Sequence, residues 1–131
     1  MIGADTSVIV RYLVGTPLDE ARRAMALLDS DEEIGVSPVA LAECAHVLRV
    51  QYGVDQGDII ESLIGLVQRE NIRVIGLRTD VLVEMLVRAR AMPGRPIPDA
   101  MIVASALDAG AVPLATFDRE QHRYGIVVRE P

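Results

Sequence analysis

The sequence predicts an α/β fold in which helices cover both faces of a parallel sheet. Short, uniformly apolar runs recur along the chain, and segments with helical periodicity separate them. Such runs suit strands buried on both faces better than half-solvated antiparallel strands. Strands that alternate with helices are typical of parallel sheets. A chain of 131 residues can bury one core, so we expect a single domain over residues 1–131.

Five short runs are expected to be strands. Each is apolar almost throughout and too short for a buried helix. The first four are far enough apart for at least one helix to lie between neighbours. The runs cover Ile2–Ala4, Ile34–Val36, Ile72–Ile75, Val112–Ala115 and Ile126–Val128.

Start and stop signals bound six helices between these strands. Ser37 before Pro38 is typical of an N-cap followed by proline at the first helical position, and Gly110 is a stop signal. The segment Met92–Pro98 is rich in proline, and we expect it to be a shaped loop beside a site. The six helices are expected from Thr6 or Ser7 to about Leu13, from Pro17 to about Asp29, from Pro38 to Tyr52, over Asp55–Gln68, from Thr79 or Asp80 onward, and from Pro98-Asp99 to Gly110.

The composition excludes several functional classes. A single cysteine, Cys44, rules out an intramolecular disulfide and a cysteine-rich zinc site. There is no signal-peptide pattern or long apolar stretch, so we expect a cytoplasmic protein with no membrane span. All thirteen basic residues are arginine, which excludes a lysine Schiff base, a phosphate-loop lysine and a lysine base.

The net charge of -6, from 19 acidic and 13 basic residues, argues at first against a nucleic-acid partner. Four of the acids, however, stand at positions that favour a site over a solvated surface. Without those four the balance is -6 + 4 = -2, so the rest of the chain is nearly neutral. We therefore expect weak nonspecific attraction to nucleic acid, not its exclusion.

Two of these acids follow predicted strands. Asp5 comes directly after the first strand, and Asp118 follows the fourth with two residues between. Ligands of parallel sheets bind beyond the carboxyl ends of the strands, so both acids are expected at one edge. Asp5 alone is equally well explained as a helix cap.

The other two acids lie in apolar helices. Glu43 stands in the run Val39–Leu48, where a buried carboxylate would need a partner or a metal ion. An exposed position at the one wet edge of the helix is the alternative. Asp99 opens a helix that is apolar over the following residues, and it too fits a cap favoured by the helix dipole.

Four carboxylates that meet would repel one another severely without a cation. Hard oxygen donors with few nitrogens suit Mg²⁺ or Mn²⁺ and not Zn²⁺. Such a centre supports hydrolysis of phosphodiesters. The sequence therefore predicts a metal-dependent phosphodiesterase if Asp5, Glu43, Asp99 and Asp118 converge.

The ordered acids resemble the motifs of PIN-domain nucleases, and the length is similar to that of VapC-type ribonuclease toxins. The motifs are Asp5-Thr-Ser7, Ser37-Pro38 with Leu41-Ala-Glu43, Asp99-Ala100 and Ala115-Thr-Phe-Asp118. The resemblance implies a three-layer α/β/α domain. It implies Asp5 and Asp99 as direct Mg²⁺ ligands, with Mn²⁺ as a substitute. Glu43 and Asp118 would complete the metal shell or orient water, and Thr116 would be a supporting hydroxyl.

The chain departs from the family after the last acid. Many relatives carry an aromatic residue three or four positions later, where Gln121 and His122 stand here. This departure bears on the placement of Asp118 and so on its metal contact.

The resemblance further implies an RNA substrate, an antitoxin partner and a homodimer. Arginines near the acids in sequence, such as Arg11 and Arg119, suit phosphate if they flank the site. Two alternatives remain: a catalytically inert PIN-like binding module, and a phospho-acceptor signalling domain. The second is disfavoured because such domains carry a lysine after the last strand and this chain has none.

Overall fold

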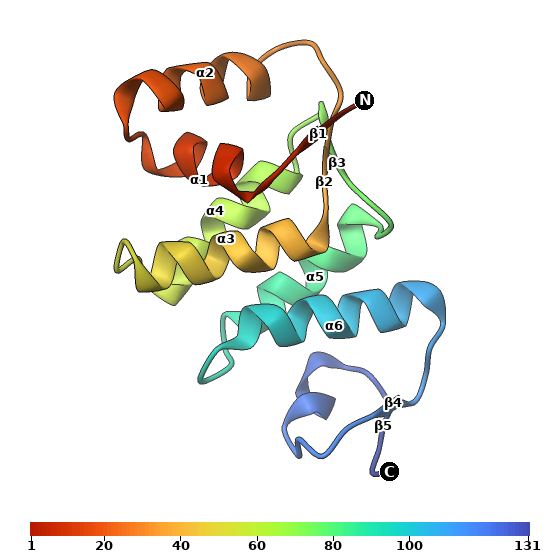
Figure 1. Ribbon diagram of the computed structural model, residues 1–131. Coiled ribbons are helices and arrows are strands. Elements are labelled where there is room, and N and C mark those ends of the chain that lie inside the picture. The colour runs from red at the N-terminus through yellow and green to blue at the C-terminus, as the bar shows by residue number, and fades with distance from the viewer. The chain divides into compact units, whose positions relative to one another are not determined.

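A three-stranded parallel sheet organises the first part of the chain (Figure 1). Its order is β1-β2-β3, and Ile2 pairs with Ile34, which pairs with Ile72. β2 is buried at every position because it lies between two strands, whereas β1 buries only Ala4. Uniform burial, expected for each strand, is therefore wrong for β1, and it is also wrong for β3, where Arg73 is exposed, and for β4 (Leu114–Ala115), where Ala115 is exposed. The strands are β1 (Ile2–Ala4), β2 (Ile34–Val36) and β3 (Ile72–Val74).

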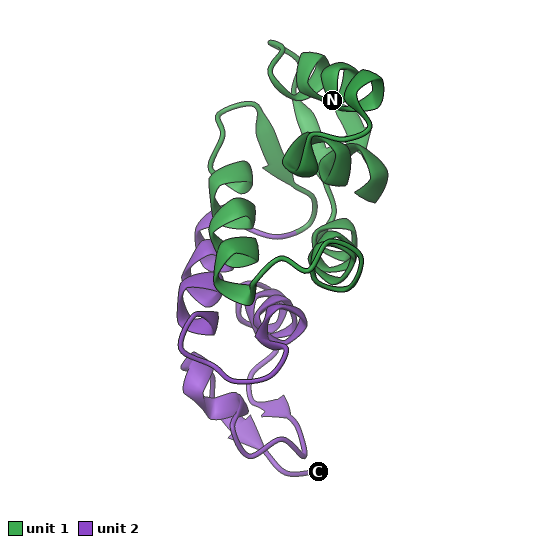
Figure 2. Ribbon diagram, turned by 90° about the vertical axis from the view of Figure 1, so that its left-hand side faces the viewer, with its two compact units in different colours: residues 1–76 green, residues 77–131 purple.

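The computed structural model describes all 131 residues and divides them into two compact units, Met1–Gly76 and Leu77–Pro131 (Figure 2). Each unit is described by itself. Both combine helices with parallel strands, so the predicted α/β class is confirmed. None of the helices has the length and apolar character that a membrane span requires.

Four helices accompany the sheet in the first unit, and their ends follow the sequence signals. Ser37 caps α3, where its Oγ accepts a hydrogen bond from the backbone N of Ala40 at 3.1 Å. Gly15 ends α1 in the left-handed conformation that glycine adopts at little cost. α1 packs against α2 and α3, and α3 packs against α4. The helices are α1 (Thr6–Val14), α2 (Leu18–Leu28), α3 (Pro38–Val50) and α4 (Gln56–Val67).

The second unit is built on two long helices, α5 (Thr79–Ala89) and α6 (Pro96–Ala109). A 3₁₀ helix, η1 (Gln121–Tyr124), contacts both of them. The short strands β4 (Leu114–Ala115) and β5 (Val128–Arg129) pair in parallel as a separate sheet.

Three details of the second unit correct the sequence prediction. α6 begins at Pro96, before the expected Pro98-Asp99 start, because proline is tolerated in the first helical turn. β5 begins two residues later than expected and ends one residue later, and η1 was not predicted. η1 is a single tight turn, too short for apolar periodicity to indicate it.

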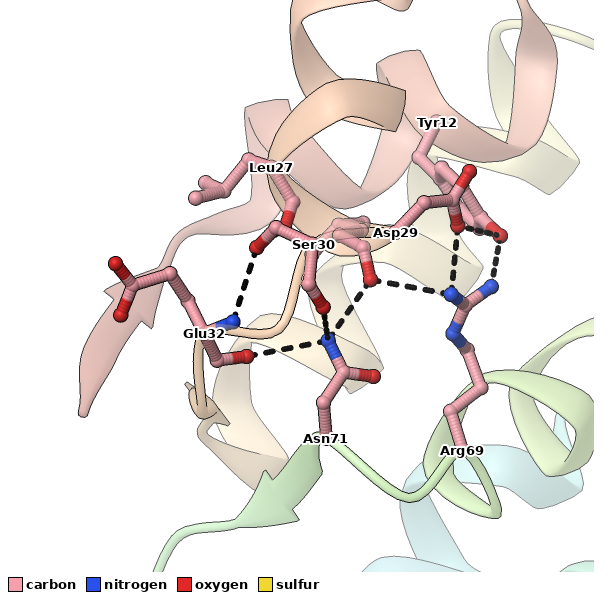
Figure 3. A network of polar contacts seen from close by, with 8 residues as sticks. Tyr12, Leu27, Asp29, Ser30, Glu32, Arg69 and Asn71 are labelled. Carbon is pink, nitrogen blue, oxygen red and sulfur yellow. Dashed lines mark hydrogen bonds and ion pairs between the residues drawn. The ribbon is translucent and has the colours of Figure 1, made fainter.

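A polar network fixes the amino ends of the strands in the first unit (Figure 3). The side-chain nitrogen of Asn71, just before β3, lies 2.9–3.2 Å from three backbone carbonyl oxygens, one at the end of α2 and two in the loop that follows it. Arg69 pairs with Asp29 at 2.6 Å and donates to the hydroxyl of Tyr12. These contacts order the end of the sheet opposite the predicted site. The three carbonyl groups belong to Leu28, Ser30 and Glu32.

Candidate functional site

Asp5 stands at the carboxyl end of β1 and caps α1. Its Oδ1 accepts hydrogen bonds from the backbone N and the hydroxyl of Ser7, at 2.9 and 2.6 Å, and from the backbone N of Val8 at 3.4 Å. Asp5 is therefore the N-cap of α1, the structural role that the sequence also indicated for it. The Ser7 hydroxyl contributes most to the lowered pKa of this exposed carboxyl, with burial acting in the opposite sense. All three hydrogen bonds fall on Oδ1 of this exposed residue, and none of them occupies Oδ2.

Glu43 lies beside Asp5 in the same hollow. Its Oε2 accepts a hydrogen bond from the hydroxyl of Thr6 at 2.8 Å, which links α3 to the start of α1. Both acids line a cavity of about 400 Å³, together with Gly3, Gly35 and other small residues. Glu43 is exposed. The alternative of an exposed position at the solvated edge of the helix is therefore correct, and no charge is buried there.

A second hollow of about 380 Å³ lies between α1 and α2 and shares Ser7 with the surroundings of Asp5. Arg11 and Arg23 line it, and Arg11 pairs through Nε with Glu20 at 2.5 Å. The hydrogen bond and charge of Glu20 raise the pKa of Arg11. Two guanidinium groups thus line this hollow, Arg11 paired with Glu20 and Arg23 with Asp19, and their planar donors suit phosphate.

Asp99 and Asp118 form the acid pair of the second unit. Asp99 lies in the first turn of α6 and is half-buried. Burial, followed by the negative charge of Asp118, raises the pKa of Asp99. The charge of Asp118 thus acts on Asp99, as expected of two acids that share a site.

Thr116 and Glu120 hold the backbone around Asp118. The Thr116 hydroxyl accepts a hydrogen bond from the backbone N of Asp118 at 2.9 Å, and Asp118 Oδ1 accepts one from the backbone N of Glu120 at 2.9 Å. Thr116 itself is tied to β5 through a hydrogen bond from its backbone N to the Arg129 carbonyl at 2.9 Å. Thr116 thus supports Asp118 through the main chain and not through the carboxylate.

Gln121 contacts the second acid pair and was not predicted to do so. It is the one buried polar side chain of the protein, 5% exposed, and its hydrogen bond to Asp99 opposes the rise in the pKa of that carboxyl. Gln121 stands at one of the two positions after Asp118 where the family resemblance leads us to expect an aromatic residue. That departure from the motif was the available signal, because a polar residue that replaces a packed aromatic needs a polar partner.

Tyr124 is a buried residue of η1 whose pKa responds to the charges of Asp99 and Asp118. Its buried hydroxyl donates to the Pro96 carbonyl at 2.9 Å and joins η1 to the first turn of α6. Burial, with added effects of the Asp99 and Asp118 charges, raises the pKa of Tyr124 to about 12. The phenol is therefore neutral at physiological pH and holds structure without exchanging a proton.

The remaining reactive side chains lie outside these pairs. Cys44 is fully buried, and burial raises the pKa of its thiol to about 12, which confirms it as a core residue without reactivity. His46 and His122 are exposed. The ring of His122 contacts the Arg119 carbonyl at 2.8 Å.

The donor set of the two pairs fits a hard divalent cation. Each unit supplies two carboxylates, and within neither unit do three or more acidic, histidine or cysteine side chains group to hold a metal. A pair of carboxylates without nitrogen or sulfur ligands favours Mg²⁺ or Mn²⁺ over Zn²⁺. A bound divalent cation would offset the unfavourable effect of the Asp118 charge on Asp99. Convergence of all four acids stays a prediction.

Comparison with known families gives one match that spans both units. The model of the PIN domain matches residues 3–127, and this range contains the four predicted acids and Thr116. PIN domains are generally nucleases and typically use divalent metal ions. Comparison with the curated proteins gives no match.

Proposed function

This chain belongs to the PIN-domain family, and from that premise we propose that it is a Mg²⁺- or Mn²⁺-dependent endoribonuclease and the toxin of a toxin-antitoxin pair. One feature supports the metal dependence: Asp99 is half-buried in the first turn of α6, and the charge of Asp118 adds to burial in raising its pKa, an effect that a bound cation would counteract. Asp5 supports it, because hydrogen bonds keep this carboxyl ionised and occupy only one of its oxygens.

Asp5, Asp99 and Asp118 would hold the cation in this proposal. When bound, the ion supplies positive charge that polarises a phosphoryl oxygen and favours deprotonation of an attacking water. Glu43, positioned by the Thr6 hydroxyl, would orient that water. Thr116 and Gln121 would keep the second pair in place through Asp118 and Asp99 respectively.

Arg11 and Arg23 would bind phosphates of the RNA that flank the scissile bond. Both line the hollow that shares Ser7 with the surroundings of Asp5. Glu20 competes for Arg11 through their ion pair. We therefore expect Glu20→Gln to lower the KM for RNA and Arg11→Gln to raise it, while Arg22→Gln, a neighbour that does not line the hollow, leaves the KM unchanged.

RNA cleavage by the purified chain with Mn²⁺ or Mg²⁺ tests the nuclease proposal. Asp5→Asn and Asp99→Asn should each lower kcat/KM by more than about 100-fold, because direct ligands matter more than outer partners. Asp31→Asn removes an exposed charge outside both pairs and serves as the matched control. Equal cleavage by the wild type and the two site variants would reveal a contaminating nuclease and refute the assignment.

Two further measurements separate the proposal from the inert-module alternative and test the toxin role. Heat of Mn²⁺ binding without RNA cleavage would favour an inert binding module. Expression of the wild type should arrest cell growth, and expression of Asp99→Asn at the same level should not. Growth arrest by both would contradict a toxin that acts through RNA cleavage. An antitoxin and a homodimer are parts of the same proposal.

A further inference from the structure

Phe117 is the most exposed large hydrophobic side chain of the protein, with 80% of its surface accessible. It is also the single phenylalanine of a chain in which only 3% of residues are aromatic. Isolated apolar side chains are common on protein surfaces, so exposure alone indicates no role. Phe117, however, directly precedes Asp118 of the second acid pair, so its ring lies next to the proposed site.

The backbone on both sides of Phe117 is anchored. Thr116 donates its backbone N–H to the Arg129 carbonyl, and its hydroxyl accepts from the backbone N of Asp118, both at 2.9 Å. Asp118 then accepts from the backbone N of Glu120 at 2.9 Å. The exposed ring therefore projects from a fixed turn, one peptide bond from the acid pair.

We propose that Phe117 stacks on an unpaired nucleobase of the RNA beside the scissile phosphate. This inference rests on the proposed ribonuclease function and adds the residue that binds a base. Unpaired bases stack on aromatic side chains with little dependence on their identity. The net charge of -6 gives little general attraction to phosphates, so a contact that does not depend on charge is expected to carry a larger share of the binding.

The stacking contact has consequences for the choice of substrate. A base can reach the exposed ring only when it is unpaired and turned out of a helical stack. The protein should therefore cleave single-stranded segments and loops in preference to duplex RNA. Binding should also depend less steeply on salt than binding through phosphates alone.

A single tryptophan reports the contact directly, because the chain has none of its own. Phe117→Trp is introduced beside Asp5→Asn, which blocks cleavage, and is titrated with a short single-stranded RNA in Mn²⁺. Its emission should fall as a base stacks on the indole. Val127→Trp in the same background is the control, since Val127 is 65% exposed in the same unit. No change at position 117, or an equal change at both positions, would overturn the inference.

Kinetics with the intact site provide the second test. Phe117→Ala should raise the KM for single-stranded RNA about 10-fold, within the range measured for loss of one stacked base. Phe117→Tyr should restore the wild-type KM, and Val127→Ala should leave it unchanged. An RNA that lacks the base beside the cleaved bond should bind the wild type and Phe117→Ala equally.

The outcomes distinguish this inference from the proposed function. If the wild type cleaves RNA and Phe117→Ala has the wild-type KM, the stacking contact is wrong and the nuclease function stands. If the wild type neither binds nor cleaves RNA, the proposed function fails and the stacking contact fails with it. Thermal melting checks that each variant is folded, which the exposure of Phe117 leads us to expect.

Discussion

The two acid pairs differ in how the protein treats their charge. In the first unit, hydroxyl groups donate hydrogen bonds to both acids: Ser7 to Asp5, whose pKa is lowered, and Thr6 to Glu43. In the second unit, Asp99 is half-buried beside Asp118, and both burial and the neighbouring charge raise the pKa of Asp99. One pair is ready to bind a cation as it stands, and the other is held in an unfavourable state that a cation would relieve.

This difference assigns distinct tasks to the two pairs. The hydrogen bonds of Asp5 also cap α1, so this residue serves the fold as well as the site. The closeness of Asp99 and Asp118 costs stability and is best explained by function, since strained electrostatics cluster at functional sites. Neutral variants of Asp99 should therefore raise the stability of the metal-free protein and abolish the proposed nuclease activity. Variants of Asp5 should not raise its stability, because they lose the cap of α1.

The largest effect expected is on metal affinity. Asp99→Asn should weaken Mn²⁺ binding by more than about 100-fold, and Glu43→Gln by about 10-fold, because Glu43 is proposed to act through water. Titration calorimetry measures both constants. Equal losses for the two variants would remove the distinction between the pairs.

The cap of α1 gives the next effect. Asp5→Ala should lower the free energy of unfolding by about 1 kcal/mol, the usual cost of losing an N-cap side chain. Asp5→Asn keeps an acceptor at this position and should preserve most of that stability. Urea unfolding without metal measures both variants. If the alanine variant is as stable as the wild type, the capping role is wrong.

The pH dependence of stability should have opposite signs for Asp99 and Asp5. The folded pKa of Asp99 lies above its ordinary value of 3.8, so ionising it as the pH rises from 3.8 through the folded pKa destabilises the fold. The folded pKa of Asp5 lies below 3.8, so its contribution is present above 3.8 and is lost as the pH falls through the folded pKa.

Asp99→Asn tests that sign. In metal-free protein, the stability of this variant relative to the wild type should increase as the pH rises above 3.8, because the variant escapes ionisation. Chemical unfolding across the acidic range provides the comparison. A constant difference between the two proteins at every pH would mean that the pKa of Asp99 does not change on folding.

Gln121 gives a smaller effect on the same carboxyl. Gln121→Leu removes the hydrogen bond that favours the Asp99 anion, so the pKa of Asp99 should rise further. NMR titration of the Asp99 carboxyl measures the shift. Gln51→Leu, an exposed glutamine of the other unit, is the control. A lowered pKa in Gln121→Leu would contradict the contact.

The exposed ion pair between Arg23 and Asp19 gives the smallest effect. The two groups lie 3.4 Å apart one helical turn from each other, and both are largely exposed. Solvent screens such pairs, so Asp19→Asn should change the free energy of unfolding by no more than about 0.5 kcal/mol. Thermal unfolding provides the measurement, and a larger loss would show that α2 depends on this pair.

Much of the fold was predictable because its signals are local. Ser37-Pro38 and Gly110 mark helix ends through interactions within a few residues, and the structure confirms both. The exposure of β1 was not predictable, because an apolar run does not reveal its neighbours in a sheet. The start of α6 was misplaced because proline permits a first helical turn as readily as a loop.

The site was predictable by residue type and less so by environment. The acids were identified from their order, and the structure brings Asp5 together with Glu43 and Asp99 with Asp118. The exposure of Glu43 contradicts the idea of a buried charge, since a helix in an apolar run still presents one face to water. Gln121 escaped prediction because its burial depends on η1, which no periodicity indicates.

Within the proposed nuclease function, we propose that the acids Asp5, Glu43, Asp99 and Asp118 bind one cation. Paramagnetic broadening by Mn²⁺ tests it most directly, because the ion broadens the NMR signals of nearby nuclei whichever residues hold it. At substoichiometric Mn²⁺, the account predicts broadening of backbone signals around Asp5 and Glu43 and around Asp99 and Asp118 together, with loss at both in Asp99→Asn. Broadening confined to one pair, or unaffected by Asp99→Asn, would contradict a shared site.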